Sequence, residues 1–342
     1  MTQRDYYFDN GKFLLIFLVV FGHFIRSFVD DSIFIRALYN TIYTFHMPAF
    51  ILISGYFATP ELNKGKLLKL IKKLLVPYVI FQTIYILFYH ILLGEPLDFN
   101  YLYPEWSLWF LLSLFSWQLL LFIFARLKKF VALSVAIILG ILIGHLQFPG
   151  GFLSLSRTIV FFPFFLLGYY MKREHFTLLR SKKMIFPAVN IILLTFILFY
   201  TNTNFDFHWL FGSKLYSEME TVLSSPSLQR VVIYLLSILM VGCFFVFVPE
   251  KKYRFTFVGR YTLYVYLLHG FFIRLFRAIP WPEWIVHEYF VWGAMVLSLL
   301  LIFILSHKYT RALTQPIIEG KWTQMKQMLR QLLEHRKHLH AK

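Results

Sequence analysis

Long apolar runs alternate with short polar segments along the whole chain. Most of these runs have about 17 to 25 residues, the length that a helix needs to cross a hydrocarbon core of roughly 30 Å. The pattern predicts an all-α membrane protein with a bundle of about ten transmembrane helices. The predicted spans are residues 12–29, 39–57, 74–93, 106–125, 130–147, 157–171, 185–202, 229–248, 259–277 and 285–307.

The predicted spans form one integral membrane domain over residues 1–307, followed by a basic tail at 308–342. In the tail, Trp322, Met325, Leu329 and Leu332 fall on one helical face, which is typical of a helix lying on a membrane surface. A partly disordered basic tail is the alternative.

The composition agrees with a membrane protein, because 58% of the residues are hydrophobic and only 15% are charged. Globular domains in water usually carry about 25% charged residues. Only one cysteine, Cys243, is present, and it lies in an apolar run. An internal disulfide and a cysteine-based metal site are therefore excluded.

The positive charges predict an orientation. With the N-terminus in the cytoplasm, 27 of the 34 Lys and Arg residues fall in segments on the cytoplasmic side. Loops rich in Lys and Arg stay on that side of a membrane. We therefore expect both termini in the cytoplasm of a multi-pass plasma membrane protein. The net charge of +17 is then explained by the topology and by contact with membrane lipids. No nucleic-acid partner is expected.

Three histidines lie near the middle of the membrane in the predicted spans. His23, His46 and His269 are on three different helices, roughly 14 to 18 Å from the cytoplasmic boundary at 1.5 Å per residue. Ionisable residues at such depth are costly and are candidates for function, and imidazole transfers protons near neutral pH. Each one could instead be a buried histidine bonded to a neighbouring helix. A metal site is not expected, because no HxxxH pair or nearby carboxylate accompanies these histidines.

Lysines gather at the predicted cytoplasmic ends of the first and third spans. Lys69, Lys72 and Lys73 in "KLIKKLLVPY" are spaced by three and four residues, so they share one helical face. Together with Lys12 they could bind phosphates. The alternatives are contact with anionic lipid for the cluster and a snorkelling anchor for Lys12.

The predicted outer side carries aromatic and acidic residues. Glu105, Trp106 and Trp109 in "PEWSLW" offer ring faces and a carboxylate, which suit a sugar. An ordinary aromatic belt at the membrane interface is the alternative. Arg157 opens the sixth span and could orient an acyl carbonyl or pair with Glu105. Arg274 and Arg277 interrupt the far end of the ninth span.

Six stretches in this order resemble the acyltransferase-3 family of integral membrane acyltransferases, in its sugar O-acetylase (fucose 4-O-acetylase-like) branch. They are "DNGKFLLIFLVVFGHF", "FHMPAFILISGYF", "KKLLVPY", "WSLWFLLSLF", "SRTIVFFPFFLLGYY" and "GRYTLYVYLLHGF", between residues 9 and 271. The resemblance implies a ten-helix bundle that transfers an acyl group, usually acetyl, from cytoplasmic acyl-CoA to a glycan hydroxyl.

Two features depart from the family pattern. The family pattern has a basic residue, ten intervening residues and then a histidine on the first helix. Lys12 and His23 match this spacing, but the family usually has arginine at the first position. Lysine keeps the charge and loses the bidentate fork. Many members also carry a glutamate shortly after "WSL", and this chain reads "WSLWFLL", so a His–Glu pair is not expected there.

The residues and the resemblance together give one hypothesis. CoA phosphates would bind Lys12, Lys69, Lys72 and Lys73, and the thioester would reach His23, the expected general base. A transient acetyl-histidine is the second mechanism. No cofactor is expected to be bound permanently, and acetyl-CoA is a substrate.

Further roles are assigned in the same hypothesis. His46, His269 and Arg157 are expected to relay protons or to stabilise an oxyanion. Glu105, Trp106 and Trp109 are expected to bind the glycan or lipid-linked saccharide. Export or flipping of a polysaccharide without acyl transfer is an alternative, and a structural or sensor role is another.

Overall fold

The structure, a computed structural model, describes residues 5–147, 151–279, 289–321, 323 and 325–331, and these residues form helices and loops with no strand. The first eight α-helices are α1 (Tyr6–Ile25), α2 (Ile33–Tyr43), α3 (His46–Tyr56), α4 (Lys64–Leu70), α5 (Val76–Leu93), α6 (Trp109–Phe124), α7 (Lys129–Leu142) and α8 (Leu155–Tyr170). The others are α9 (Arg173–Leu179), α10 (Ile185–Thr201), α11 (His208–Phe211), α12 (Pro226–Phe247), α13 (Thr262–Ala278), α14 (Phe290–Ser306) and α15 (Lys308–Glu319).

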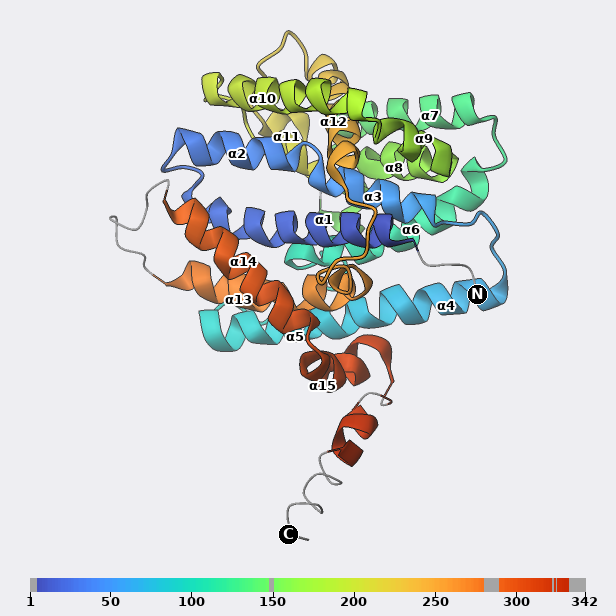
Figure 1. The fold of residues 1–342 in the computed structure, drawn as a ribbon, viewed down its shortest axis with the longest axis vertical. Helices are drawn as coiled ribbons and strands as arrows, with labels where there is room; N and C mark the ends of the chain where they lie inside the picture. Colours follow the sequence, from blue (N-terminus) through green and yellow to red (C-terminus); the bar gives the residue numbers. More distant parts are fainter. Residues whose placement is uncertain (1–4, 148–150, 280–288, 322, 324, 332–342) are drawn as a thin grey trace.

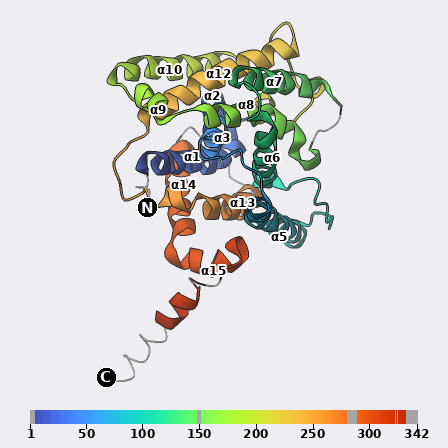
Figure 2. The same ribbon diagram turned by 90° about the vertical axis from the view of Figure 1, so that its right-hand side faces the viewer.

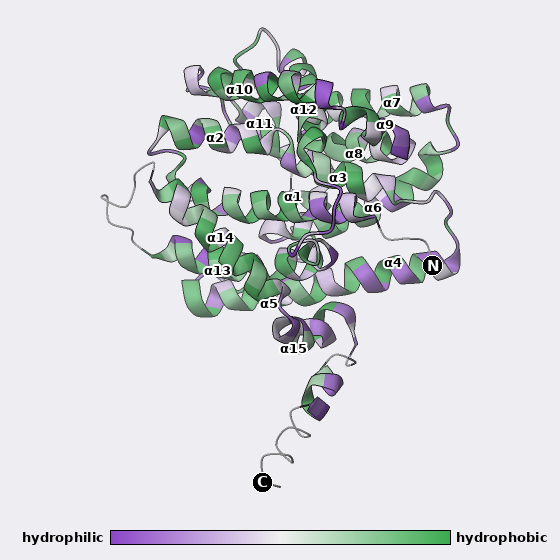
Figure 3. Cartoon of the chain, in the orientation of Figure 1, coloured by the Kyte–Doolittle hydropathy of each residue, from purple (hydrophilic) through white to green (hydrophobic). Residues whose placement is uncertain are grey.

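Helix α1 lies at the centre of the bundle and packs against α3, α13 and α14 (Figures 1 and 2). Helix α3 packs against α8, which is flanked by α6 and α7, and α10 packs against α2 and α12. Most of the bundle is coloured as apolar in Figure 3, while α4 and α15 carry many polar residues. Apolar outer surfaces on a fully helical fold are what a bilayer requires, because helices satisfy their own backbone groups.

Six helical segments in the described part of the chain are long and apolar enough to span a membrane, and a seventh is counted if α14 and α15, bent by 65°, are one span. The predicted ranges 39–57, 130–147, 259–277 and 285–307 correspond to shorter helices. Residues 285–288 lie outside the described part. The fold class is therefore confirmed, while the number of crossings and the cytoplasmic placement of both termini stay predictions.

The predicted span 39–57 is broken in the structure, because α2 ends at Tyr43 and α3 begins at His46. The Thr44 hydroxyl donates to the carbonyl of Thr41 in the preceding turn, and such bonds compete with the regular helical pattern. Pro48 stands in the first turn of α3, where its missing N–H costs nothing. The break places His46 at the start of a helix in the middle of the bundle.

The chain beyond residue 307 begins with a helix that packs on the bundle. In α15, Glu319 accepts a hydrogen bond from the Tyr264 hydroxyl at 2.6 Å, and the Arg311 guanidinium lies 3.6 Å from the ring centroid of Tyr261. Residues 325–331 form a further helical segment. Two residues of the predicted amphipathic face, Trp322 and Leu332, lie outside the described residues.

Two glycines allow α3 and α8 to approach closely. A Cβ atom at Gly55 would lie 2.8 Å from the carbonyl carbon of Phe165, and one at Gly168 would lie 2.8 Å from that of Leu52. Small residues that bring backbones together are typical of helix contacts in membranes. This contact fixes α3, which carries His46, against α8, which carries Arg157.

We expect Gly168→Ala to destabilise the protein by about 1–3 kcal/mol, because the added methyl group meets backbone that cannot move aside easily. Gly293→Ala is the matched control, since a Cβ at Gly293 meets nothing within 4 Å. Thermal unfolding in detergent measures both. Equal stability of the two variants would contradict the role given to the α3–α8 contact.

Candidate active site

A cavity of about 310 Å³ lies among α1, α2, α3, α6, α8, α11 and α13. Five residues that the sequence singled out line it: His23, His46, Trp106, Trp109 and Arg157. They come from four separate helices and the turn before α6, so the fold gathers side chains that lie up to 134 positions apart in the chain. We call this space the histidine cavity.

His23 of α1 is in ring contact with two of the predicted residues. Its ring centroid lies 5.1 Å from that of Trp106 in an edge-on arrangement and 5.4 Å from that of His269, nearly parallel to it. His269 is fully buried behind His23 and Trp106. The structure therefore brings the three predicted histidines to one place, with His23 and His46 on the cavity wall.

Hydrogen bonds define the neutral forms of His46 and His269. Nδ1 of His46 lies 3.0 Å from the carbonyl oxygen of Ile42, and Nδ1 of His269 lies 2.7 Å from that of Tyr266. A carbonyl only accepts, so Nδ1 carries the proton and Nε2 keeps its lone pair. His46 on the cavity wall therefore has a ring nitrogen that can accept a proton.

Trp106 has an unusual backbone, with a φ of 43°. Bulky residues rarely adopt positive φ, and such strain concentrates at functional sites. The conformation belongs to the short helix Trp106–Leu108 before α6. It holds the indole against both His23 and His269, so packing around these rings balances the strain.

Arg157 of α8 lines the histidine cavity, and its guanidinium carbon lies 5.1 Å from the ring centroid of Trp109. Glu105 lies elsewhere, in a separate pocket of about 230 Å³ with Glu95 and Asp98. Burial raises the pKa of the Glu105 carboxyl; the carboxylate of Glu95 adds to this shift, and the guanidinium of Arg274 opposes it. The predicted group of Glu105, Trp106 and Trp109 is thus divided between two spaces.

A second cavity, of about 730 Å³, is lined by all three lysines of the predicted cluster, Lys69, Lys72 and Lys73. Lys72 and Lys73 lie in a π-helical turn, Ile71–Leu75, between α4 and α5, and such turns are frequent at functional sites. The end of α15 adds Ile318 and Glu319 to the wall, and Lys321 follows just after that helix. We call this space the lysine cavity.

The two cavities share part of their walls. Phe50, Phe110 and Tyr266 line both of them. The Tyr266 hydroxyl donates a hydrogen bond to the carbonyl of Ser107, which fixes the ring at this border. A basic cavity and a cavity with histidines therefore adjoin one another across three aromatic side chains.

The sequence profile of the family described as "Acyltransferase domain" (Acyl_transf_3) matches residues 5–307. The chain belongs to the acyltransferase-3 family. The match covers every residue that lines the histidine cavity of this membrane acyltransferase.

Two curated relatives are similar to this acyltransferase. The "Nodulation protein NolL" of Sinorhizobium fredii is 25% identical over 314 residues, which cover 82% of this chain and 81% of the relative. The "Nodulation protein NolL" of Mesorhizobium japonicum is 38% identical over 61 residues, which cover 17% of this chain and 16% of that protein. No solved structure matches the chain.

Lys12 of the acyltransferase does not line the lysine cavity. Its ammonium nitrogen lies 2.9 Å from the buried carboxylate of Asp9, which Arg260 also approaches at 3.7 Å. The neighbouring Asn10 donates to the carbonyls of Pro249 and Lys251. The start of the "DNGK" stretch thus fastens α1 to the loop before α13, and the structure gives Lys12 a partner that the sequence analysis did not consider.

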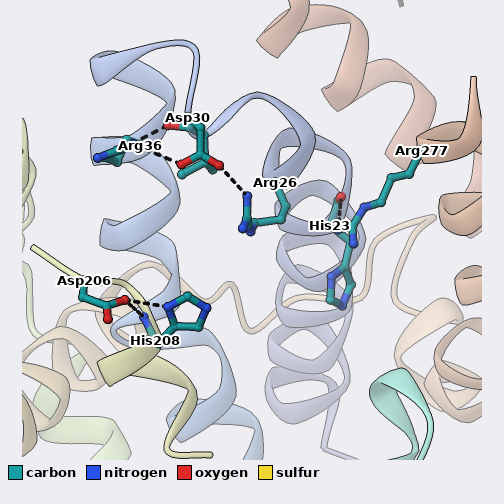
Figure 4. A network of polar contacts seen from close by, with 8 residues as sticks. His23, Arg26, Asp30, Arg36, Asp206, His208 and Arg277 are labelled. Atoms are coloured by element: carbon teal, nitrogen blue, oxygen red, sulfur yellow. Dashed lines mark hydrogen bonds and ion pairs between the residues drawn. The ribbon is translucent and has the colours of Figure 1, made fainter. Parts of the chain in front are cut away.

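Arg277 is a cavity residue that the sequence analysis missed as a site residue. Its Nη2 donates to the carbonyl oxygen of His23 at 2.8 Å (Figure 4), and its guanidinium lies 5.5 Å from the ring centroid of Trp106. Arg26, Tyr39 and Tyr43 also line the cavity. A charged residue inside an apolar run was the available signal for Arg277, but its position near a helix end suggested a boundary.

We expect Lys12→Met to destabilise the acyltransferase by about 1–3 kcal/mol, because the buried carboxylate of Asp9 loses the ammonium at 2.9 Å and keeps the more distant Arg260, at 3.7 Å. Adding Asp9→Asn should restore part of the loss, since the buried charge is then gone. Thermal unfolding and the KM for acetyl-CoA are measured together. A raised KM at unchanged stability would instead support the phosphate-binding role that the sequence predicts for Lys12.

Proposed function

We propose that this protein is an acyl-CoA-dependent O-acyltransferase that moves an acetyl or similar group to a hydroxyl of a cell-surface or lipid-linked glycan. The observation that carries the proposal is the border between the lysine cavity and the histidine cavity at Phe50, Phe110 and Tyr266. A phosphate-bearing donor and a base for an alcohol are thereby given adjoining sites in one membrane acyltransferase.

The lysine cavity fits the polar end of acyl-CoA. Lys69, Lys72 and Lys73 line it together, and ammonium groups attract phosphates in a partly apolar site. Its volume of about 730 Å³ is within the usual range of small-molecule sites, roughly 300–1,000 Å³. The donor would bind with its phosphates at the lysines and its thioester directed past Tyr266.

His23 is proposed as the general base. Its ring lines the histidine cavity, and no hydrogen bond to its ring nitrogens is formed by the described residues. The acceptor hydroxyl would give its proton to His23 while its oxygen attacks the thioester carbonyl. The C–S bond then breaks, the CoA thiolate takes up a proton, and the new C–O bond leaves an ester on the glycan.

Other cavity residues have supporting roles in this proposal. Nε2 of His46 has a lone pair and faces the same space, which suits a proton relay with His269 behind His23. Arg157 could stabilise the oxyanion of the tetrahedral intermediate. Trp106 and Trp109 offer ring faces to a sugar. The reaction would take place within the plasma membrane, among its lipids.

His23→Ala should lower acetyl transfer by about 10²–10⁴-fold, the usual contribution of a general base. Mass spectrometry of surface glycans, with and without the variant, measures the ester. His90→Ala is the matched control, because His90 is exposed on α5 and lies outside the cavity. Normal acetylation by the His23 variant at equal membrane expression would refute the proposal, and less glycan at the surface with normal acetylation would favour export.

Replacing Lys69, Lys72 and Lys73 together by Gln should raise the KM for acetyl-CoA at least tenfold, since three charges facing the phosphates are lost. The control is Lys182→Gln with Lys183→Gln, two exposed lysines before α10. Initial rates at varied acetyl-CoA concentration give the KM. An unchanged KM in the triple variant would show that the lysine cavity does not hold the donor.

A further inference from the structure

The histidine cavity is positively charged in a way that the acyl transfer itself does not explain. Three arginines, Arg26, Arg157 and Arg277, line it, and no Asp or Glu of the described residues does. A charge in a membrane interior is expensive unless a partner compensates it. Three cations at one cavity therefore call for anions.

Arg26 has a carboxylate partner. Its Nη1 lies 3.3 Å from the carboxylate of Asp30, which also pairs with Arg36 at 3.1 Å (Figure 4). Arg274, one turn before Arg277 on α13, likewise pairs with Glu95 at 2.6 Å. The chain thus compensates the neighbouring arginines with its own carboxylates.

Arg157 and Arg277 have no such partner among the described residues. Arg157 rests on Trp109, at 5.1 Å from the ring centroid, and makes no hydrogen bond or ion pair within that part of the chain. Arg277 rests on Trp106 and donates to the uncharged carbonyl of His23, and its Nε is buried without a hydrogen-bond partner. Both guanidiniums lie against indole rings. Both keep N–H groups that are not used in hydrogen bonds to the described residues.

The oxyanion of the reaction does not account for these two charges, because it exists only in the intermediate, whereas the guanidiniums persist in the resting protein. The donor phosphates do not account for them either. They are assigned to the lysine cavity, whose wall contains neither arginine. The remaining occupant is the acceptor.

We propose that the acceptor is an anionic saccharide, whose carboxylate or phosphate is bound by the guanidiniums of the histidine cavity that have no carboxylate partner, while its hydroxyl faces His23. This inference rests on the proposed acyl transfer and adds the class of substrate. Guanidinium forks match carboxylate and phosphate oxygens. A cavity of about 310 Å³ is at the lower end for small-molecule sites, which suits a single sugar residue.

The test uses membranes that contain the full chain, saturating radioactive acetyl-CoA, and the glycan acceptors of those membranes. Transfer is measured while glucose, glucuronate or glucose 1-phosphate is added as a competitor. We expect one of the two anions to inhibit at least tenfold more strongly than glucose. Stronger inhibition by glucuronate indicates a carboxylate, and stronger inhibition by glucose 1-phosphate indicates a phosphate.

Two variants on one helix locate the effect. Arg277→Gln should abolish the preference for the anionic competitor, and Arg277→Lys should keep part of it. Arg274→Gln, one turn away, should leave the preference intact. A merely structural effect of Arg277→Gln on His23 would lower the rate without changing the ratio of inhibition constants, so an unchanged ratio would overturn the inference.

The variant Lys72→Gln distinguishes inhibition at the donor site from inhibition at the acceptor site. It should leave the preference for the anionic competitor unchanged, because Lys72 lies outside the histidine cavity. Equal inhibition by glucose and both anions would also overturn the inference, and so would an ester found only on saccharides without carboxylate or phosphate. In both cases acyl transfer itself still stands. Absence of any transfer in wild-type membranes would instead refute the proposed function, and this inference with it.

Discussion

The compensation of charge in an apolar environment organises this protein. At one end of α1, the buried carboxylate of Asp9 is matched by Lys12 and Arg260. Near the other end of the bundle, Glu95 matches Arg274. Because uncompensated charge in lipid is costly, these pairs fix loops to helices. The histidine cavity differs from these sites, because Arg157 and Arg277 line it and neither forms an ion pair with a carboxylate of the described residues.

Trp106 is the side chain on which the cavity depends most. It contacts His23 and His269 through its ring and supports the Arg277 guanidinium on its face. Its positive φ is unfavourable for so large a residue, and the surrounding rings hold it there. A strained residue that touches two histidines and an arginine is typical of a site whose geometry matters more than local stability.

Much of this arrangement follows from sequence because depth in a membrane is readable from distance along a helix. The three histidines were expected at one depth, and their rings do lie together; the three lysines spaced by three and four residues do line one cavity. Other features depend on contacts between distant segments. The break before His46, the pairing of Lys12 with Asp9 and the backbone of Trp106 are set by packing against neighbouring helices, which no local pattern records.

The proposed reaction gives a reason for the aromatic border between the two cavities. In the proposed reaction the donor carries phosphates and the acceptor carries an anion, so each needs cations, and the two sets of cations must stay apart. In that proposal the lysines of the α4–α5 segment, which line one cavity, bind one substrate, and the arginines of α8 and α13, which line the other, bind the second. Only a small, uncharged acyl group has to pass Phe50, Phe110 and Tyr266. An apolar border admits that group and opposes mixing of the two anions, because a charge crossing it would lose its partners.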